Sequence, residues 1–233
     1  MAEAADVGAV VPAAGVGVRL GRRPRKALVP LDGQPLILQT LYALHRAATI
    51  RWIVVAVHQT DRIRVASWVR KAGLSRVTAV IAGGASRAES VARAMTQLPA
   101  QARWVMVHDG ARPCVKPQLV DRVVKAAKQE GAAACGLRAA LTVKTAEPDG
   151  RVRLTLDRDG LWLMQTPQAF RRDWWQEALA RIGSRLEQFP DDVAVLEWAG
   201  FPVRVVEGDP LNLKVTTRDD LLLAEAILKN RKR

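Results

Sequence analysis

The stretch VGAVVPAAGVGVRLGRRPRKAL, residues 7–28, passes from apolar residues through small residues to basic ones. Its first five residues are continuously apolar, which is typical of a strand buried on both faces of a parallel sheet. Small residues dominate positions 13–17, so a ligand could approach the backbone amides there. Five of the eight residues from Arg19 to Lys26 are basic, and cations suit phosphate. The stretch predicts a strand followed by a phosphate-binding loop, with a solvated basic loop as the alternative.

The pattern of that opening strand recurs along the chain. Apolar runs occupy residues 7–11, 52–57, 77–81, 104–108 and 132–137, and helical patterns occupy residues 36–47, 61–72, 87–98 and 117–129. Strands that alternate with helices in this way favour an α/β fold with a doubly wound sheet.

The pattern changes at residues 139–158, where two alternating segments flank the turn sequence EPDG. This arrangement predicts a β-hairpin whose exposed edges pack on their own domain or pair with a partner subunit. Further helices are expected at residues 171–182, 192–199 and 217–228, a strand at 201–208, and a segment NLKV at 212–215. Because no linker or repeat interrupts this series, we expect one domain, residues 1–233, with 139–158 as a protruding arm.

Composition bounds the class of protein. The chain has 233 residues, of which 49% are hydrophobic and 25% charged, as expected of a globular protein. No apolar run reaches the roughly 18 residues of a membrane span, and the N-terminus MAEAADVG does not resemble a signal peptide. Cys114 and Cys135 form no zinc-binding pattern with the scattered histidines. We expect a cytoplasmic protein with no membrane partner.

The net charge of +13 indicates an anionic partner: nucleic acid, an acidic surface or a polyanionic small molecule. Aromatic residues make up 5% of the chain and do not intersperse the basic segments, unlike in grooves that bind nucleic acid. Small polyanionic substrates are therefore favoured over nucleic acid.

Two common nucleotide-binding loops are disfavoured. Gly15 and Gly17 are followed by Leu20 where a dinucleotide-binding fingerprint has its third glycine, and Gly21 comes one residue late. No GxxxxGK[ST] sequence occurs, so the loop is not a Walker loop either.

The segment VMVHDGARP, residues 105–113, places Asp109 directly after an apolar strand. The carboxyl ends of such strands form the ligand-binding edge of an open α/β sheet. Asp109 could accept hydrogen bonds from a ribose or polyol, or help to hold Mg²⁺ near phosphates, with Arg112 beside it. A capping aspartate is the structural alternative.

The segment GGASRAESV, residues 83–91, predicts a helix that begins with a capping box formed by Ser86 and Glu89. A glycine-rich helix start also presents amides to a ligand, so Arg87 or Ser90 could face a pocket there.

Taken together, PAAGxGxR with a lysine seven residues later, GGxxRxxSV, VHDxARP, LDRxGLWxxQTPQxF and NxKVT resemble the 2-C-methyl-D-erythritol 4-phosphate cytidylyltransferase family. The match runs from about residue 8 to residue 228 in the family's order. The resemblance implies a Rossmann-like, mostly parallel sheet of the nucleotidyltransferase (GT-A-like) type with an inserted β-hairpin arm. It also implies that methylerythritol phosphate attacks the α-phosphate of CTP, a reaction catalysed chiefly by positioning and electrostatics.

The resemblance also implies roles for individual residues. Arg19 and Lys26 would stabilise charge on the triphosphate and in the transition state, and Arg158 and Lys214 would orient the attacking phosphate. Contacts with CTP are implied for Pro12, Ala13, Ala14, Gly15, Gly17, Gly83, Arg87, Ser90 and Asp109. Contacts with the second substrate are implied for Asp109, Arg112, Thr142, Arg158, Thr166, Asp191 and Lys214. Mg²⁺ is expected, bound mainly by the triphosphate, with Asp109 as its candidate protein ligand.

The resemblance further implies a homodimer in which the 139–158 arm carries Thr142 and Arg158 into the neighbouring subunit's site. Three positions depart from the family pattern: Leu141 replaces an aspartate, Pro190 a threonine, and Arg25 a proline. The first two concern polyol recognition, so a ribitol-5-phosphate cytidylyltransferase is an alternative. A non-catalytic nucleotide-binding module is disfavoured because all four implied catalytic cations are present.

Overall fold

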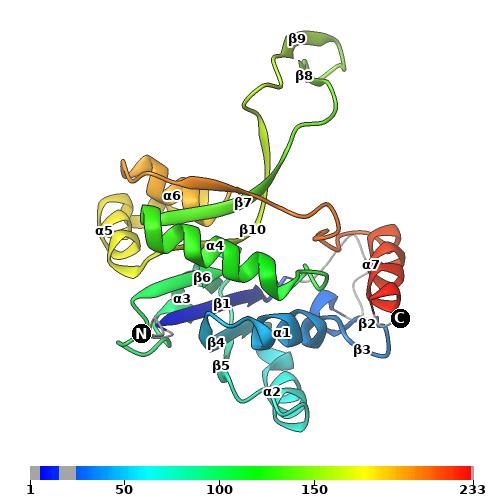
Figure 1. Cartoon of the computed structure of the whole chain (residues 1–233), viewed down its shortest axis with the longest axis vertical. Coiled ribbons are helices and arrows are strands. Elements are labelled where there is room, and N and C mark those ends of the chain that lie inside the picture. Colours follow the sequence, from blue (N-terminus) through cyan, green and yellow to red (C-terminus); the bar gives the residue numbers. More distant parts are fainter. Residues whose placement is uncertain (1–5, 16–24, 232–233) are drawn as a thin grey trace.

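The computed structural model describes residues 6–15 and 25–231, shown in Figure 1. The strands of its central sheet are β1 (Val7–Ala13), β4 (Ile50–Val57), β5 (Val77–Ala82), β6 (Trp104–Val107), β7 (Ala132–Arg138), β10 (Trp162–Arg171) and β11 (Arg204–Glu207). Their order across the sheet is β11-β7-β10-β6-β1-β4-β5. The five predicted apolar runs are the strands β1, β4, β5, β6 and β7, which confirms the alternating α/β interpretation.

The sheet is mostly parallel. Strand β1 pairs in parallel with β4 on one side and with β6 on the other, while β4 pairs in parallel with β5 and β7 with β11. Strand β10 is antiparallel to both of its neighbours, β6 and β7. The chain therefore runs from β1 outward to β4 and β5 on one side, and the connection from β5 then crosses to β6 on the other side of β1. Such a switch point is where open α/β sheets bind ligands.

Strand β10 is the central element that the sequence interpretation missed. Pro167 lies inside it, and a proline in an apolar run argues against a central strand because it cannot donate a ladder hydrogen bond. The register with β7 shifts between Met164 and Gln168, and Pro167 lies within that gap. The irregular pairing is what allows a proline in the middle of the sheet.

Helices cover both faces of the sheet, as Figure 1 shows. One face packs against α1 (Leu36–Arg46), α2 (Arg62–Lys71) and α4 (Pro117–Glu130), and the other against α3 (Arg87–Met95), α5 (Arg172–Ile182) and α6 (Asp192–Trp198). Each of these helices packs on the sheet through an apolar stripe, and α4 is an example. Its buried residues recur at helical spacing and form one such stripe: Leu119, Val120, Val123, Val124 and Ala127. Gly131, with φ of 94°, then ends the helix.

The C-terminal part differs slightly from the prediction. Strand β11 occupies half of the predicted run 201–208, and the segment 212–215 forms no strand. Helix α7 (Arg218–Asn230) begins with a capping box between Thr217 and Asp220. It packs against the short strand β2 (Pro30–Leu31), which pairs with β3 (Gln34–Pro35). Within the described residues, no helix is long and apolar enough to cross a membrane.

The predicted β-hairpin projects from the sheet as a two-stranded ribbon of β8 (Val143–Ala146) and β9 (Val152–Leu156), as Figure 1 shows. Gly150, with φ of 88°, supplies the left-handed residue of its turn. Most residues of both strands are exposed, including Val152 and Leu154. The ribbon therefore leaves apolar side chains unpacked by its own chain.

Candidate active site

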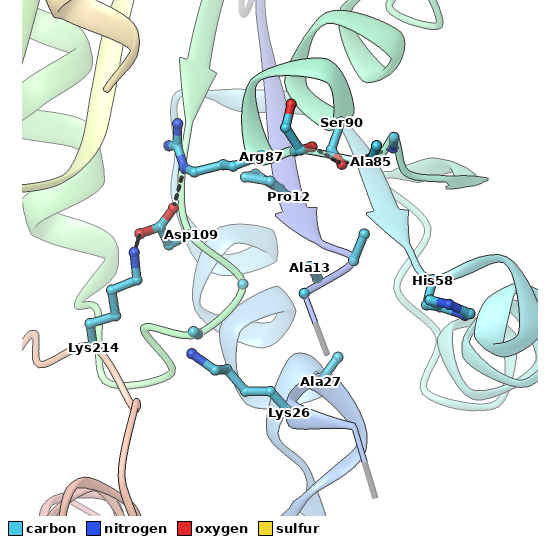
Figure 2. Close-up of a pocket in the computed structure, with 16 residues that line it drawn as sticks. Pro12, Ala13, Lys26, Ala27, His58, Ala85, Arg87, Ser90, Asp109 and Lys214 are labelled. Carbon is cyan, nitrogen blue, oxygen red and sulfur yellow. Dashed lines mark hydrogen bonds and ion pairs between the residues drawn. The ribbon is translucent and has the colours of Figure 1, made fainter. Parts of the chain in front are cut away.

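A cavity of about 460 Å³ lies at the carboxyl ends of β1, β4 and β6 (Figure 2). Its lining residues come from the ends of these strands, the start of α3 and two distant segments: Pro12, Ala13, Ala14, Gly15, Lys26, Ala27, His58, Gly84, Ala85, Ser86, Arg87, Ser90, Asp109, Gly110, Ala111 and Lys214. The cavity thus occupies the ligand-binding edge that the strand pattern predicts.

Small residues let the loops around the cavity pack closely. A Cβ on Gly83 would lie 2.4 Å from the Cβ of Ala14, and one on Gly110 would lie 2.8 Å from the Cβ of Ala13. Both approaches are shorter than real Cβ contacts. Gly83 therefore allows Ala14 to pack closely against its backbone, and it does not itself line the described cavity. The sequence interpretation had instead placed Gly83 in contact with CTP.

The loop that precedes α3 is held by the first turn of that helix. Ser86 caps the helix by accepting from the amide of Glu89 at 3.1 Å, as predicted, and the Glu89 carboxylate accepts from the amide of Ala85 at 2.7 Å. The hydroxyl of Ser90 accepts from the amide of Gly84 at 2.9 Å and donates to the carbonyl of Ser86. These contacts fix residues 84–86 at the cavity wall.

One carboxylate organises the charges of the cavity. Arg87 Nε donates to Asp109 Oδ1 at 3.0 Å, and Lys214 Nζ lies 2.7 Å from Asp109 Oδ2 (Figure 2). The remaining nitrogens of the Arg87 guanidinium bind both oxygens of Asp192, at 3.2 and 2.7 Å. Arg87 thus bridges two acids that lie on different elements, and Asp109 holds two cations at once.

These cations keep Asp109 ionised. Burial opposes ionisation, but Arg87 and Lys214 outweigh it and hold the pKa of Asp109 below its usual range. At neutral pH the cavity therefore combines one carboxylate with the positive charges of Arg87, Lys214 and Lys26. Such a site can hold anions while Asp109 accepts hydrogen bonds or binds a cation.

Buried backbone contacts position Lys214. Asn212, which is fully buried, donates to the carbonyl of Thr166 at 2.8 Å and accepts, through its own carbonyl, a hydrogen bond of 2.8 Å from Arg112. The amide of Val215 donates to the carbonyl of Ala111 at 2.8 Å. Lys214 lies between these two anchored residues, so the backbone from which its side chain extends is held in place.

A second network fixes the backbone of Asp109. The carbonyl of Arg112 can only accept, so His108 Nε2, at 3.2 Å, is protonated and donates to it. The other nitrogen, Nδ1, then accepts from the hydroxyl of Thr166 at 3.1 Å, and this hydroxyl accepts from the amide of Asp109 at 3.0 Å. The register of β10 against β6, which pairs Gln168 with Val107, brings Thr166 to this place.

The protonation of His108 gives a prediction about stability. Burial lowers the pKa of His108 to about 4, against 6.5 for an exposed imidazole. Between these values the unfolded chain binds a proton that the folded chain does not, so the unfolding free energy should fall as the pH falls. The loss should be about 1.4 kcal/mol per pH unit and about 3 kcal/mol in total.

Urea unfolding of the wild type and of His108→Gln at several values from pH 7 to pH 4.5 tests this prediction. We expect the wild type to lose more stability than the variant over that interval. Equal losses in the two proteins would assign the pH dependence to carboxylates elsewhere.

Lys26 and His58 also line the cavity, each from a different segment of the chain (Figure 2). Lys26 begins a short 3-10 helix, and the next two residues, Ala27 and Leu28, are buried in the core. His58 follows β4 directly, and its Nδ1 accepts from the amide of Thr60 at 3.3 Å. Both side chains therefore originate from well-anchored backbone.

The structure brings many of the predicted site residues together. The cavity is lined by Pro12, Ala13, Ala14, Gly15, Lys26, Arg87, Ser90, Asp109 and Lys214. Arg19 and Gly17 lie outside the described residues, so their predicted roles remain predictions.

Besides Gly83, five of the predicted residues that the structure describes are not among those that line this cavity. Arg112 and Thr166 are buried behind it, where they hold Asn212 and Asp109 in place. Asp191 caps α6 and lines a separate cavity of about 120 Å³. Thr142 and Arg158 are exposed on the arm, and Arg158 donates to the carbonyl of Ala140.

Sequence reasoning missed several residues. His58, Gly84, Ala85, Ser86, Gly110 and Ala111 also line the cavity, and Asp192 and Asn212 support it. His58 could have been found from its position, because it directly follows the apolar run 52–57, and Asp109 likewise comes just after an apolar run. Asp192 had no such signal, since its partner Arg87 lies 105 positions away.

Comparison with known proteins decides the family. The family model described as "IspD: 2-C-methyl-D-erythritol 4-phosphate cytidylyltransferase" matches residues 7–230. The chain belongs to this family. A 2-C-methyl-D-erythritol 4-phosphate cytidylyltransferase of Synechococcus elongatus is 41% identical over 226 residues, which cover 95% of this chain and 96% of the relative. That of Syntrophus aciditrophicus is 38% identical over 222 residues and 95% of each chain.

Solved structures of the family share the fold. The cytidylyltransferase of Thermus thermophilus superposes with a TM-score of 0.77 at 32% identity, covering 96% of this chain and 99% of the other. A 4-diphosphocytidyl-2C-methyl-D-erythritol synthase of Anaerococcus prevotii gives a TM-score of 0.82 at 25% identity, covering 96% and 98%. The predicted fold class is confirmed, and the protein is an enzyme of the nucleotidyltransferase class. The comparisons do not favour the ribitol-phosphate alternative.

Proposed function

We propose that this enzyme transfers the cytidylyl group of CTP to 2-C-methyl-D-erythritol 4-phosphate in isoprenoid precursor biosynthesis. An oxygen of the methylerythritol phosphate attacks the α-phosphorus of CTP, and the bond from that phosphorus to the oxygen of the β-phosphate breaks. The products are 4-diphosphocytidyl-2-C-methyl-D-erythritol and pyrophosphate. The observation that carries the proposal is the cavity at the switch point, where Asp109, Lys214 and Lys26 meet in a chain that matches the family from residue 7 to residue 230.

The chemistry requires two anions to approach each other while charge builds on the leaving pyrophosphate. Fixed cations lower the free energy of such a transition state most when they are already in position. Lys26 and Lys214 line the cavity from different segments of the chain, as Figure 2 shows, and Lys214 is the one that Asp109 holds. We assign the triphosphate to Lys26 and the attacking phosphate to Lys214. The family resemblance implies the same division.

Asp109 then has two tasks in this proposal. It holds Lys214 at 2.7 Å and so positions it, and it faces the cavity as an acceptor for substrate hydroxyls. Arg87 is the residue whose role we revise. Its guanidinium binds Asp109 and Asp192, so we propose that it orders the acid and does not contact CTP through that group.

We propose that Mg²⁺ assists the reaction, held mainly by the triphosphate. Among the described residues that line the cavity, Asp109 supplies the one carboxylate. No group of three or more potential ligands occurs within residues 6–15 and 25–231. This donor set fits Mg²⁺, which commonly uses one or two carboxylates together with substrate phosphates. The ion would neutralise phosphate charge when bound.

We further propose that the enzyme is a homodimer joined through its arms. Four apolar side chains on or beside the arm are more than half exposed: Leu141, Val152, Leu154 and Leu163. Thr142 and Arg158, to which the resemblance gives substrate contacts, are exposed on this arm and do not line the described cavity of their own chain. Pairing the arms would cover the apolar side chains and would supply Thr142 and Arg158 to the partner's cavity.

The proposed partners are therefore CTP, the polyol phosphate and a second copy of the chain. We propose neither nucleic acid nor a membrane as a partner, because a small polyanion accounts for the charge that the cavity concentrates. We propose the cytoplasm as the compartment, since Cys114 and Cys135 are buried as free thiols, which suits a reducing environment.

Pyrophosphate release with CTP and Mg²⁺ tests the proposal and its substrate. We expect rapid release with 2-C-methyl-D-erythritol 4-phosphate and little with ribitol 5-phosphate, assayed in parallel. This result would make Leu141 and Pro190 tolerated variations. Release with ribitol 5-phosphate alone would keep the chemistry and overturn the substrate.

A further inference from the structure

The segment that carries Lys26 is tied to the turn after β4 by an ion pair. Arg25 Nη1 donates to Asp61 Oδ1 at 3.0 Å and to Asp61 Oδ2 at 3.3 Å. The side chain of Asp61 is 8% exposed and that of Arg25 is 28% exposed. The contact joins residues 36 positions apart, so it fixes two separate segments relative to each other.

The local backbone leaves the Asp61 carboxylate available for this ion pair. Asp61 is the last residue of the 3-10 turn Gln59–Asp61 and lies directly before α2, with helical backbone angles (φ −99°, ψ −10°). A residue that caps a helix has non-helical angles, and the Asp61 side chain makes no capping hydrogen bond. Its oxygens face Arg25.

Both ends of the ion pair lead directly to the cavity. Lys26 follows Arg25 in the chain, and His58 is linked to Asp61 through Thr60, whose amide donates to His58 Nδ1 at 3.3 Å. Figure 2 shows that Lys26 and His58 come from different segments of the ribbon. The ion pair therefore joins the segment that carries Lys26 to the turn that follows His58.

We infer that Arg25 and Asp61 act as positioning residues, whose ion pair holds Lys26 where it can act on the triphosphate. On the far side of Lys26, the buried residues Ala27 and Leu28 anchor the chain in the core. Lys26 thus lies between an apolar anchor and an ionic one. The sequence departs from the family pattern at Arg25, and the structure gives that residue a partner. This inference rests on the role proposed for Lys26.

Charge-removing variants test the inference. Arg25→Gln and Asp61→Asn should each lower kcat by about 10- to 100-fold, because displacing a reacting group by an ångström can cost that much. The double variant should lose no more than either single one, since both remove the same contact. The exchanged pair, Arg25→Asp with Asp61→Arg, should recover most of the lost turnover.

Arg103→Gln is the matched control. Arg103 also binds a nearly buried aspartate, with its Nε 3.2 Å from Asp6 Oδ2, but this pair lies where β1 and β6 begin, at the edge of the sheet opposite the cavity. Its kcat should stay near the wild-type value. Its thermal midpoint should fall less than that of Arg25→Gln, because Arg103 is more exposed and Asp6 keeps an ion pair with Lys128.

CTP affinity measured by calorimetry in the presence of Mg²⁺ gives a second readout, which needs no turnover. Arg25→Gln should bind CTP several-fold more weakly than the wild type or Arg103→Gln. Unchanged kcat and affinity in Arg25→Gln, or losses that multiply in the double variant, would overturn the inference. A wild type that binds CTP but transfers nothing would instead overturn the proposed function, while the affinities would still decide the role of Arg25. If Asp61→Asn failed to fold, the partly exposed Arg25 would still provide the test.

Discussion

Lys26→Ala is expected to lower kcat by about 10²–10³-fold or more, the cost of removing one preorganised charge from a transition state. The side chain lines the cavity, and the other described lining cations, Arg87 and Lys214, are both bound to Asp109. The fold should be unaffected, because Ala27 and Leu28 supply the buried contacts of this segment. Steady-state turnover and thermal unfolding of the purified variant measure both expectations.

Lys229→Ala is a suitable control for this experiment. Lys229 is an exposed lysine on α7 that pairs with Glu225 on the same helix, away from the residues that line the cavity. Its removal should leave kcat unchanged. Near-normal turnover in Lys26→Ala, with a native thermal midpoint, would remove Lys26 from the mechanism.

Two inactive variants are expected to restore activity when they are combined. If Arg158 acts in the partner's cavity, then a mixed dimer of Lys26→Ala and Arg158→Ala contains one site with both defects and one with neither. Random pairing makes half of the dimers mixed, so about a quarter of the wild-type activity should return. Each variant alone should be nearly inactive, because each lacks one cation that faces the reacting phosphates.

The control is a mixture of Lys26→Ala with Lys214→Ala. Both residues line the cavity of a single chain, so every site in a mixed dimer retains one defect and no activity should return. The mixtures are unfolded, refolded together and assayed for pyrophosphate release, with dimer content measured by gel filtration. Mixed dimers of Lys26→Ala and Arg158→Ala that remain inactive would contradict the composite site.

The sequence predicted the ligand-binding edge well, for a physical reason. Parallel strands buried on both faces are continuously apolar, so their ends can be located, and residues that follow them meet at one edge. This placed Asp109 and residues 13–15 together correctly. The same rule would have found His58, had it been applied to the strand at residues 52–57.

What the sequence could not show is the set of contacts behind the cavity wall. Arg112 was predicted to contact substrate, but its guanidinium holds the carbonyl of Asn212, 100 positions away. Thr166 lies on β10, which was not predicted as a strand because Pro167 interrupts its pattern. The contact between Thr166 and the amide of Asp109 therefore had no signature in the local sequence. Such contacts depend on which loops the fold brings together.

The direct test of the account is the fate of the cytidylyl group. Wild-type enzyme is incubated with CTP, Mg²⁺ and 2-C-methyl-D-erythritol 4-phosphate, and the phosphorus NMR spectrum of the mixture is recorded. The account predicts a new diphosphate that links cytidine to methylerythritol, together with one equivalent of pyrophosphate. Pyrophosphate with free CMP, or CTP left intact, would contradict cytidylyl transfer.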